Sequence, residues 1–255
     1  MEKRALIRQF AFGLGFIFSV MMEVGARADE VVTICFEEWA PFAYTRDGVA
    51  QGIQISLMEE ALARIDRTVV FHSVPYQRCR KSMQEGQYDA ILAESLSHDG
   101  IATDVSLLSW DLGVVVHQDW PAETFDRLED FSGNSVGLVK SYSYSDLLAG
   151  VYDTLDVQFA PDAIFNLRKL ALKRIDFTIV DVPWAITVIN QEKLPLKILL
   201  PILSSEPQFT TFGPGNEALV GQLDQVLQEM VSDNTVEDAY RKVFGNNLPP
   251  GMTFH

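Results

Sequence analysis

The stretch VVTICFEEWAPFAYTRDGVAQGIQISLMEEALARI, residues 31–65, decides the fold. It opens with an apolar run of strand length and ends with apolar side chains at positions 53, 57, 58, 61, 62 and 65, which is a helical spacing. Trp39 and Pro41 follow the first run, and proline has no N–H to give to a sheet ladder, so the chain leaves the sheet there. The stretch therefore predicts a buried strand, an outward turn and a covering helix.

The next residues continue the same alternation. TVVFHSV (68–74) is a second strand, RCRKSMQEG (78–86) a short helix, and YDAILAE (88–94) a third, buried strand. This βαβαβ order predicts a parallel sheet with helices on its faces. Ligands of such sheets bind beyond the carboxyl ends of the strands. We therefore expect the segments EEWAPF, PYQRCR and ESLSHDG to face one crevice.

A second unit of the same kind occupies residues 128–192. It reads as a short helix, the strand SVGLV (135–139), a helix from about Tyr144, the strand VQFA, a helix capped by Asp162, the strand DFTIV (177–180 with its preceding Asp176) and a final helix. The tail, 215–245, predicts two amphipathic helices. Two such units with opposed strand ends predict a cleft between them.

The N-terminus carries the features of an export signal. Three basic residues in the first eight positions precede the apolar stretch 10–22, and Ala26-Arg27-Ala28 matches a signal-peptidase site, which predicts cleavage between Ala28 and Asp29. The alternative is a membrane anchor, but the 13 apolar residues are fewer than the roughly 20 that span a bilayer. A bacterial periplasmic location is expected.

Composition excludes two classes of partner. The chain has 255 residues, 47% of them hydrophobic, and a formal net charge of −15. Removing residues 1–28 takes away four Lys or Arg and two Asp or Glu, so the exported chain carries −17. Nucleic acids and anionic membranes bind to basic patches, and so acidic a protein is not expected to bind either.

Cys35 and Cys79 are the two cysteines. In an oxidising compartment they can form a disulfide, and the alternative is a pair of buried free thiols. The sequence leaves both readings open. Two cysteines without a matching pair of histidines do not make a structural zinc site, so neither a metal nor a cofactor is expected.

The order of these elements resembles that of the extracellular solute-binding proteins of family 3, which are periplasmic proteins of the polar-amino-acid type that serve ABC importers. The resemblance covers nearly all of the exported chain. It rests on WAPFAYTRDGVAQGIQISLMEEA, GQYDAILAE, LEDFSGNSVGLVKSYS, IDFTIVDVPWA and the closing helices that end in KVFG. It implies an α/β, two-lobe, type II periplasmic-binding-protein fold, in which each lobe is a mixed, mostly parallel sheet flanked by helices and the ligand cleft lies between the lobes.

The resemblance also implies a division of the chain. After the signal peptide (1–28), lobe 1 comprises residues 29–110 and 208–255, and lobe 2 comprises the inserted residues 111–207. The crossings are expected near Trp110 and near residues 204–207. A ligand closes the two lobes by a hinge motion.

Three of the implied site residues follow predicted strands. Trp39 and Tyr76 stand where the family places aromatic side chains that cover the ligand, and such a pair suits an apolar or cationic group. The alternative for both is a place in the core. Asp181 stands where amino-acid-binding members bind the α-ammonium group; its alternative is to cap the helix that begins near Pro183, and the two roles are compatible.

Tyr142 and Ser143 follow the strand SVGLV with Lys140 and Ser141. Family members often have a Gly-Thr or Gly-Ser loop here, whose backbone N–H groups hold an anionic group at a helix N-terminus. This chain has bulkier residues in place of the glycine. The alternative is a solvated polar turn.

The main departure from the family comes after YDAILAE. Amino-acid-binding members carry an arginine there that binds the α-carboxylate with two hydrogen bonds, an arrangement that is hard to replace. This chain has no Arg or Lys between Lys81 and Arg127. A standard α-amino acid is therefore not the expected ligand. Arg78, better placed than Arg80, supplies the positive charge in this reading; the alternative is an exposed helix arginine.

Glu94 and Ser95, at the end of the third strand, also point to the cleft in this reading. With Glu37, Glu38 and Asp181 nearby, Glu94 makes the expected crevice acidic, which favours a cationic or amine-bearing solute.

The expected function is therefore binding without catalysis. A monomer captures a small polar solute, amino-acid-like or amine-bearing, and delivers it to the permease of an ABC importer. One alternative is a stand-alone periplasmic sensor that presents its closed form to a membrane receptor. Another is a periplasmic dehydratase on the same fold, but the chain has no nucleophile elbow, no metal-ligand spacing and no paired histidine and carboxylate motif.

Overall fold

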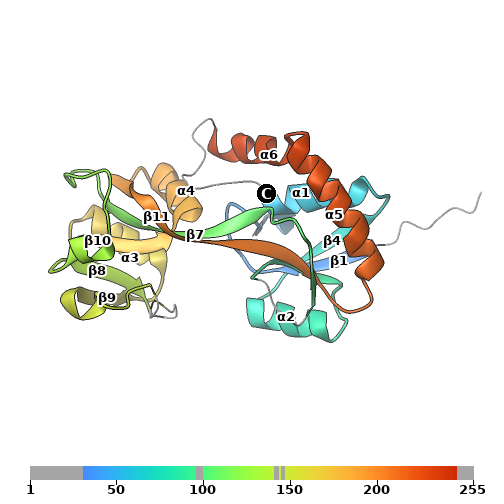
Figure 1. Ribbon diagram of the computed structural model, residues 1–255, viewed down its shortest axis with the longest axis horizontal. Helices are drawn as coiled ribbons and strands as arrows, with labels where there is room; N and C mark the ends of the chain where they lie inside the picture. The colour runs from blue at the N-terminus through green and yellow to red at the C-terminus, as the bar shows by residue number, and fades with distance from the viewer. Residues whose placement is uncertain (1–30, 96–99, 141–143, 145–146, 246–255) are drawn as a thin grey trace, which may run out of the picture.

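Two globular halves joined by two long strands make up the molecule (Figure 1). The computed structural model describes residues 31–95, 100–140, 144 and 147–245. The predicted signal peptide lies outside these residues. We call the half that contains the first strand lobe 1 and the half that contains residues 135–192 lobe 2.

Lobe 1 is built on the predicted βαβαβ unit. Its three parallel strands lie in the order β4-β1-β5, and the helices follow the strands as expected. A short hairpin, which the sequence did not predict, connects β1 to the first helix. The elements are β1 (Val31–Phe36), β2 (Tyr44–Arg46), β3 (Val49–Gln51), α1 (Ile53–Ala63), β4 (Thr68–Ser73), α2 (Tyr76–Gln84), β5 (Ala90–Glu94) and β6 (Ile101–Ala102).

Lobe 2 repeats this architecture with the strand order β10-β8-β9, all parallel. The predicted strands and helices form, with one exception: residues 147–151 make turns rather than a helix beginning near Tyr144, and Gly150, at φ +85°, breaks the helical path. The elements are η1 (Leu128–Phe131), β8 (Ser135–Val139), η2 (Tyr152–Thr154), β9 (Asp156–Ala160), α3 (Ala163–Ala171), β10 (Phe177–Asp181) and α4 (Val182–Glu192).

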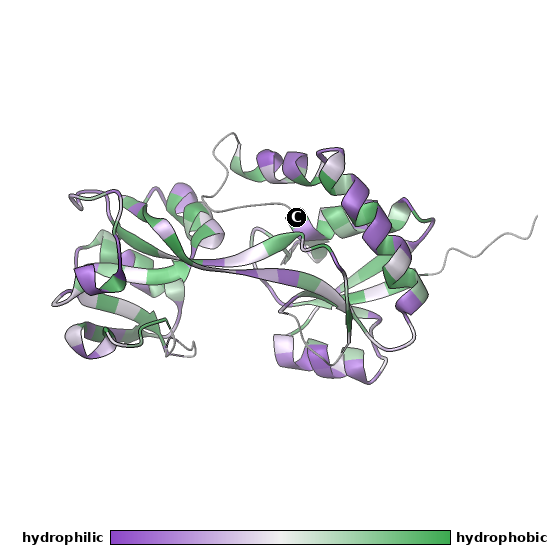
Figure 2. Ribbon diagram, viewed as in Figure 1, coloured by the Kyte–Doolittle hydropathy of each residue, from purple (hydrophilic) through white to green (hydrophobic). Residues whose placement is uncertain are grey.

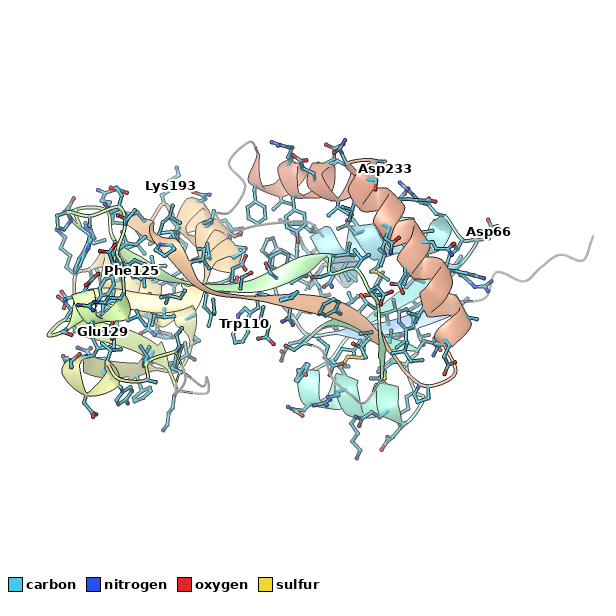
Figure 3. The ribbon with its side chains drawn as sticks, in the orientation of Figure 1. Asp66, Trp110, Phe125, Glu129, Lys193 and Asp233 are labelled. Carbon is cyan, nitrogen blue, oxygen red and sulfur yellow. A yellow bond between two sulfur atoms is a disulfide. The ribbon has the colours of Figure 1, made fainter. Side chains whose placement is uncertain are left out.

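The two lobes are joined by β7 (Leu108–His117) and β11 (Leu196–Phe212), which run antiparallel to each other. Where the chain crosses, Trp110 pairs with Glu206 and Asp111 with Ser205. Figure 3 shows Trp110 on this narrow crossing. Because β11 also pairs with β5 in lobe 1 and β7 also pairs with β10 in lobe 2, one nine-stranded sheet passes through the whole molecule. The predicted lobe boundaries fall inside these two strands.

Each lobe has a core of its own. One cluster of buried side chains draws on residues 32–108 and 212–240, and two further clusters draw on residues 112–199. The closing helices, α5 (Glu217–Ser232) and α6 (Thr235–Phe244), return to lobe 1 and pack on α1. Many of the apolar residues lie in the strands, whereas α2 is largely hydrophilic (Figure 2). None of the helices in the described ranges is long and apolar enough to cross a membrane.

Candidate functional site

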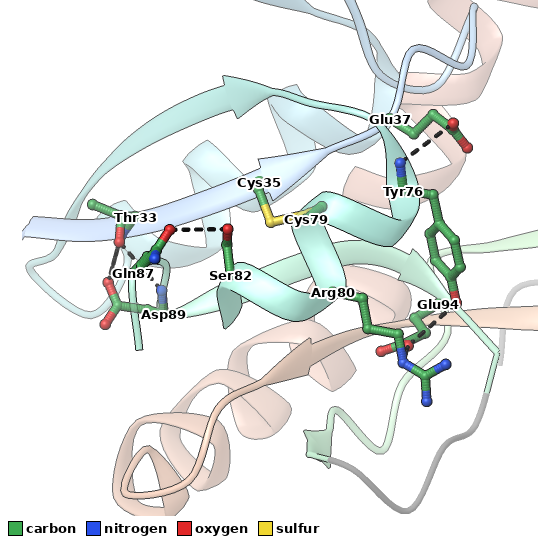
Figure 4. The surroundings of a disulfide bond; sticks show 10 residues. All are labelled: Thr33, Cys35, Glu37, Tyr76, Cys79, Arg80, Ser82, Gln87, Asp89 and Glu94. Carbon is green, nitrogen blue, oxygen red and sulfur yellow. Dashed lines mark hydrogen bonds and ion pairs between the residues drawn. A yellow bond between two sulfur atoms is a disulfide. The ribbon is translucent and has the colours of Figure 1, made fainter. Parts of the chain in front are cut away.

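The carboxyl ends of β1, β4 and β5 lie together at one edge of lobe 1 (Figure 4). Tyr76, the first residue of α2, connects them. Its backbone N–H donates to Glu37 Oε1 at 3.4 Å, and its hydroxyl donates to Glu94 Oε1 at 3.3 Å. The three segments that follow the strands therefore meet at the edge where the sequence places a ligand.

A disulfide fixes one side of this edge. Cys35 and Cys79 are bonded, with an S–S distance of 1.97 Å and a Cα–Cα distance of 5.6 Å. Of the two readings that the sequence leaves open, the structure shows the disulfide. The bond joins α2 to β1 across 44 residues of sequence, and closing a loop of that size stabilises a folded chain by about 4 kcal/mol in the chain-entropy model. It therefore holds the helix that carries Tyr76.

Glu94 is buried at the end of β5, with 1% of its surface exposed, and it pairs with Arg80. Arg80 Nε lies 3.1 Å from Glu94 Oε1. Burial and the negative charge of Glu94 raise the pKa of Tyr76, whereas the positive charge of Arg80 opposes that rise. The Glu94 carboxylate and the Arg80 guanidinium are therefore paired at the carboxyl end of β5.

Helix geometry decides which arginine reaches this place. Arg80 is four residues after Tyr76 and lies on the same face of α2, whereas Arg78 is two residues after it and is exposed. Arg80 is therefore the arginine that contacts Glu94, and the expectation that Arg78 gives the ligand a positive charge stays a prediction. Ser95 lies nearby, and its Oγ accepts a hydrogen bond from Gln208 Nε2 of β11 at 3.2 Å.

Trp39 sits in a tight loop that is anchored to α1. Its N–H donates to Ala43 O at 2.7 Å, and the first N–H groups of α1 donate to carbonyls of the same loop. The indole packs on Phe42, with ring centroids 4.9 Å apart. Gly52 makes this possible, because it has φ +132° and a Cβ there would lie 2.2 Å from Phe42 O. Trp39 is partly buried, so its ring is a rigid feature of the lobe surface.

Asp181 ends β10 and caps α4. Its Oδ1 accepts the N–H of Trp184 at 2.8 Å, so the capping role is present. The helix starts close to β7 because position 113 is a glycine: a Cβ on Gly113 would lie 2.5 Å from Val182 Cγ2. The close packing of β7 against α4 thereby sets the position of the Asp181 carboxylate.

The environment of Asp181 raises its pKa to about 7. Burial is the largest cause, and the negative charge of Asp111 acts in the same direction. The N–H of Trp184 and the side chain of Trp39 oppose the rise by hydrogen bonding. The Trp39 contact is weaker than a well-formed hydrogen bond, since by distance and angle Asp181 Oδ2 has no partner among the described residues. Trp39 of lobe 1 and Asp181 of lobe 2 therefore meet across the junction.

Asp111 is the residue that sequence reasoning missed. It is fully buried in β7, with 0% of its surface exposed, and within the described residues neither carboxylate oxygen has a hydrogen-bond partner. Alternation along the strand puts it on the same face as Gly113, which is the face that α4 covers. The signal was present, because Asp111 is a lone acid inside the apolar run LSWDLGVVV.

Tyr240 of α6 completes this group. It is buried, its hydroxyl donates to Leu107 O at 2.6 Å, and burial together with the charges of Asp111 and Asp181 raises its pKa. We call Trp39, Asp111, Asp181 and Tyr240 the junction cluster. It draws one residue each from the β1 loop, β7, β10 and α6.

Other candidate features lie elsewhere. Tyr142 and Ser143 are outside the described residues, and Lys140 before them is exposed. No group of three or more potential metal ligands exists in the described part of the chain. A surface hollow lined by Val31, Arg67, Asp89 and Gln222, among others, lies at the amino ends of the lobe 1 strands, away from the junction cluster.

Comparison of the sequence with protein-family models identifies the family. A family model described as bacterial extracellular solute-binding proteins, family 3, matches residues 32–246. The chain belongs to this family. The resemblance seen in the sequence is thus confirmed, and this family-3 protein belongs to a group whose members bind solutes outside the cytoplasm.

One curated relative is similar to this protein over part of its sequence. The L-cystine-binding protein TcyJ of Escherichia coli (strain K12) is 24% identical over 125 residues, which is 49% of this chain and 47% of TcyJ. This family-3 protein therefore spans about half the length of the curated relatives it matches.

Solved structures confirm the fold. The probable amino-acid ABC transporter extracellular-binding protein ytmK of Bacillus subtilis is 18% identical, with a TM-score of 0.73 over 85% of this chain and 98% of ytmK. An ancestral arginine-binding protein bound to arginine is 21% identical, with a TM-score of 0.64 over 84% of this chain and 98% of that one. This family-3 protein has the predicted two-lobe, type II periplasmic-binding-protein fold.

Proposed function

We propose that this protein captures a small amine-bearing solute between its two lobes in the periplasm and delivers it to the permease of an ABC importer. The observation that carries the proposal is the meeting of Trp39 and Asp181 across the junction between the lobes. An aromatic face from one lobe and a carboxylate from the other are the two groups that an aliphatic ammonium ion needs.

Each lobe has a part in this proposal. Trp39 and Tyr76 of lobe 1 (29–110 and 208–255) cover the solute, and Asp181 of lobe 2 (111–207) accepts N–H donors from its ammonium group. Ser95, Tyr142 and Ser143 are assigned to the polar rim. The strands β7 and β11 bend between the open and closed forms.

The chemistry of lobe 1 argues against a ligand that depends on its α-carboxylate. Arg80 already pairs with Glu94, which is buried, and leaving that carboxylate without its partner is unfavourable. A ligand carboxylate therefore has to compete with Glu94 for Arg80. Because the relative TcyJ is named for L-cystine, this amino acid is a direct test of the argument.

The family and the sequence support the proposed location and partners. Residues 1–28 direct export, the protein acts as a monomer without a cofactor, and its acidic surface does not bind nucleic acid. It releases the solute chemically unchanged, so it is not an enzyme. The same capture step would serve a membrane sensor; uptake of the labelled solute through a neighbouring permease distinguishes transport from sensing.

A thermal-shift screen of the exported chain tests the proposal. The panel contains aliphatic amines, polyamines, cationic and neutral amino acids, L-cystine, short peptides and organic acids. We expect amine-bearing compounds to raise the melting temperature by mass action. Mass spectrometry of the recovered compound checks that it is unchanged.

Two variants locate the binding event. Trp39→Ala and Asp181→Ala should each weaken the affinity for the selected amine about tenfold or more, which is the range of one charge-assisted contact. Asp162→Ala is the matched control, because Asp162 caps α3 in the same lobe as Asp181 caps α4, with its Oδ1 accepting Phe165 N–H. An affinity that survives both site substitutions contradicts the proposal.

A further inference from the structure

The two crossing strands carry Trp110 and Glu206 side by side. These residues are directly opposite each other in the antiparallel register of β7 and β11, so their side chains leave the same face with Cβ atoms about 4.5–5.5 Å apart. Glu206 is exposed and Trp110 is partly exposed. Within the described ranges, the Glu206 carboxylate takes part in no ion pair. An aromatic ring and a carboxylate are thus both accessible on one face of the crossing.

Contacts on either side place this face at the base of the cleft. On the lobe 1 side, Gln208 lies on the same face as Glu206, and its Nε2 donates to Ser95 Oγ at 3.2 Å, just beyond the carboxyl end of β5. On the lobe 2 side, Trp110 packs against the core cluster that contains Tyr144, whose hydroxyl accepts a backbone N–H at the carboxyl end of β8. Figure 3 shows the Trp110 side chain leaving the narrow crossing between the lobes.

The other face of β7 is covered. Asp111 is fully buried there, and Gly113 on the same face packs against Val182 at the start of α4. A solute held between the lobes therefore meets Trp110, rather than Asp111, on this strand.

We propose that Trp110 and Glu206 form a second cation-binding subsite for the solute, located on the crossing and separate from Asp181. The face of an indole ring attracts a cation, and a carboxylate beside the ring supplies the counter-charge. This inference rests on the proposed function, which assigns one amine to Trp39 and Asp181. It narrows the ligand class to solutes with two cationic groups, of which aliphatic diamines are the simplest.

Strand geometry gives the separation of the two subsites. Asp181 of β10 pairs with Leu112, and Glu206 of β11 pairs with Trp110, on opposite edges of β7. The two acids are therefore two residues apart along the strands and two strand spacings apart across them, which puts their Cα atoms about 12 Å from each other. With a charge-assisted hydrogen bond of about 2.8 Å at each end, an aliphatic chain of about five carbons spans the remainder.

Calorimetry on the whole exported chain with 1,5-diaminopentane and 1-aminopentane tests this inference. The two probes share the apolar chain and one amine, and they differ only in the second amine. Low ionic strength is used, because salt screens exposed charges such as Glu206. We expect the diamine to bind about fivefold or more tightly than the monoamine. Equal affinities in the wild-type protein would overturn the inference, whatever any variant shows.

Two substitutions locate the second amine. Glu206→Gln and Trp110→Leu should each weaken diamine binding about fivefold or more and leave monoamine binding unchanged, so the ratio of the two affinities falls. Damage to the fold or to the hinge lowers both affinities together and leaves their ratio unchanged. Glu229→Gln is the control, because it removes an exposed acid from α5 and should not alter the ratio. A ratio that survives both crossing substitutions contradicts the inference.

The outcomes separate this inference from the proposed function. If the monoamine and the diamine bind equally well, and both depend on Trp39 and Asp181, only the inference falls. If neither probe binds, but a singly charged amine from the thermal-shift panel does, the inference falls and solute capture stands. If no member of the panel binds, both fall.

Discussion

Asp181 serves two purposes with one side chain. One oxygen caps α4, and the other is buried near Asp111 without a partner of good geometry in the described residues. The capping bond fixes where the carboxylate sits, and the missing bond leaves it able to receive a donor from outside. A residue of this kind stabilises its helix and, through its buried charge, destabilises the empty protein.

The pKa of Asp181 predicts how stability depends on pH. Because this pKa is raised from 3.8 to about 7, the folded protein binds more protons than the unfolded chain between these values, and stability falls as pH rises from about 4 to about 7. Asp181→Asn keeps a capping oxygen and removes the charge. We expect it to increase the free energy of unfolding at pH 8, by on the order of 1–3 kcal/mol, and to flatten the decline. Denaturant unfolding at pH 5 and pH 8 measures both effects.

Asp162→Asn is the control for this prediction, because Asp162 caps α3 in the same way but is exposed. It should leave the dependence of stability on pH unchanged. Identical pH profiles for Asp181→Asn and the wild-type protein would contradict a buried charge at this position.

The candidate site was predictable at the residues that directly follow strands. Trp39, Tyr76 and Asp181 could be named as candidates because the end of an apolar run can be read from the sequence and the family resemblance assigns these positions a role. Asp111 was missed because it lies inside a strand, where the side chain's face depends on the register. Arg78 was preferred over Arg80 because the start of α2 at Tyr76, which sets the helical phase, was not considered.

At the scale of elements, β7 and α4 show how packing places the site. The helix begins against the strand at Gly113, and the closest side-chain atom belongs to Val182, the residue next to Asp181. Any group larger than hydrogen at position 113 has to push the start of α4 outward. The geometry of the junction cluster therefore depends on a glycine that touches no ligand.

Gly113→Ala tests this dependence. The new methyl group meets Val182 Cγ2 at 2.5 Å, and overpacking of this kind costs about 1–3 kcal/mol. It should also weaken ligand binding, because Asp181 moves with the helix. Gly221→Ala in α5 is the matched control: a Cβ there meets nothing within 4 Å, and alanine should stabilise the helix by about 0.5–1 kcal/mol. Chemical denaturation compares the two, and equal effects would exclude the packing argument.

The local sequence pattern was enough to predict most helices and strands, but it did not predict the two strands that cross between the lobes. The short helices and buried strands of both lobes were predicted from spacing and caps, including Asp162 as a cap. The sequence of β11 contains Pro201 and Pro207, and proline argues against a long strand. Both are accommodated here: Pro201 lies where the register with β7 shifts between Leu199 and Ser204, and Pro207 pairs with Ser109.

For the molecule as a whole, the chain path makes the lobes interdependent. Lobe 1 is completed by α5 and α6 only after the chain has built lobe 2, and Tyr240 brings α6 to the buried acids. The two-lobe fold was predictable because the order of elements resembles a known family. Which side chains of β7 are buried at the crossing was not predictable. That depends on contacts between residues more than a hundred positions apart, such as Tyr240 and Leu107.

Because Trp39 lies beside Asp181, the intrinsic tryptophan fluorescence of the protein should report ligand binding. Indole emission responds to the polarity and charge around the ring, and a bound cation changes both for Trp39. Trp120 stacks on Phe131 in the core of lobe 2 and gives a constant background. We expect ligand to shift the ultraviolet emission of the wild-type protein and of Trp120→Phe. A shift of the same size in Trp39→Phe would mean that the signal comes from another tryptophan, such as Trp110 on the crossing or Trp184 beside Asp181.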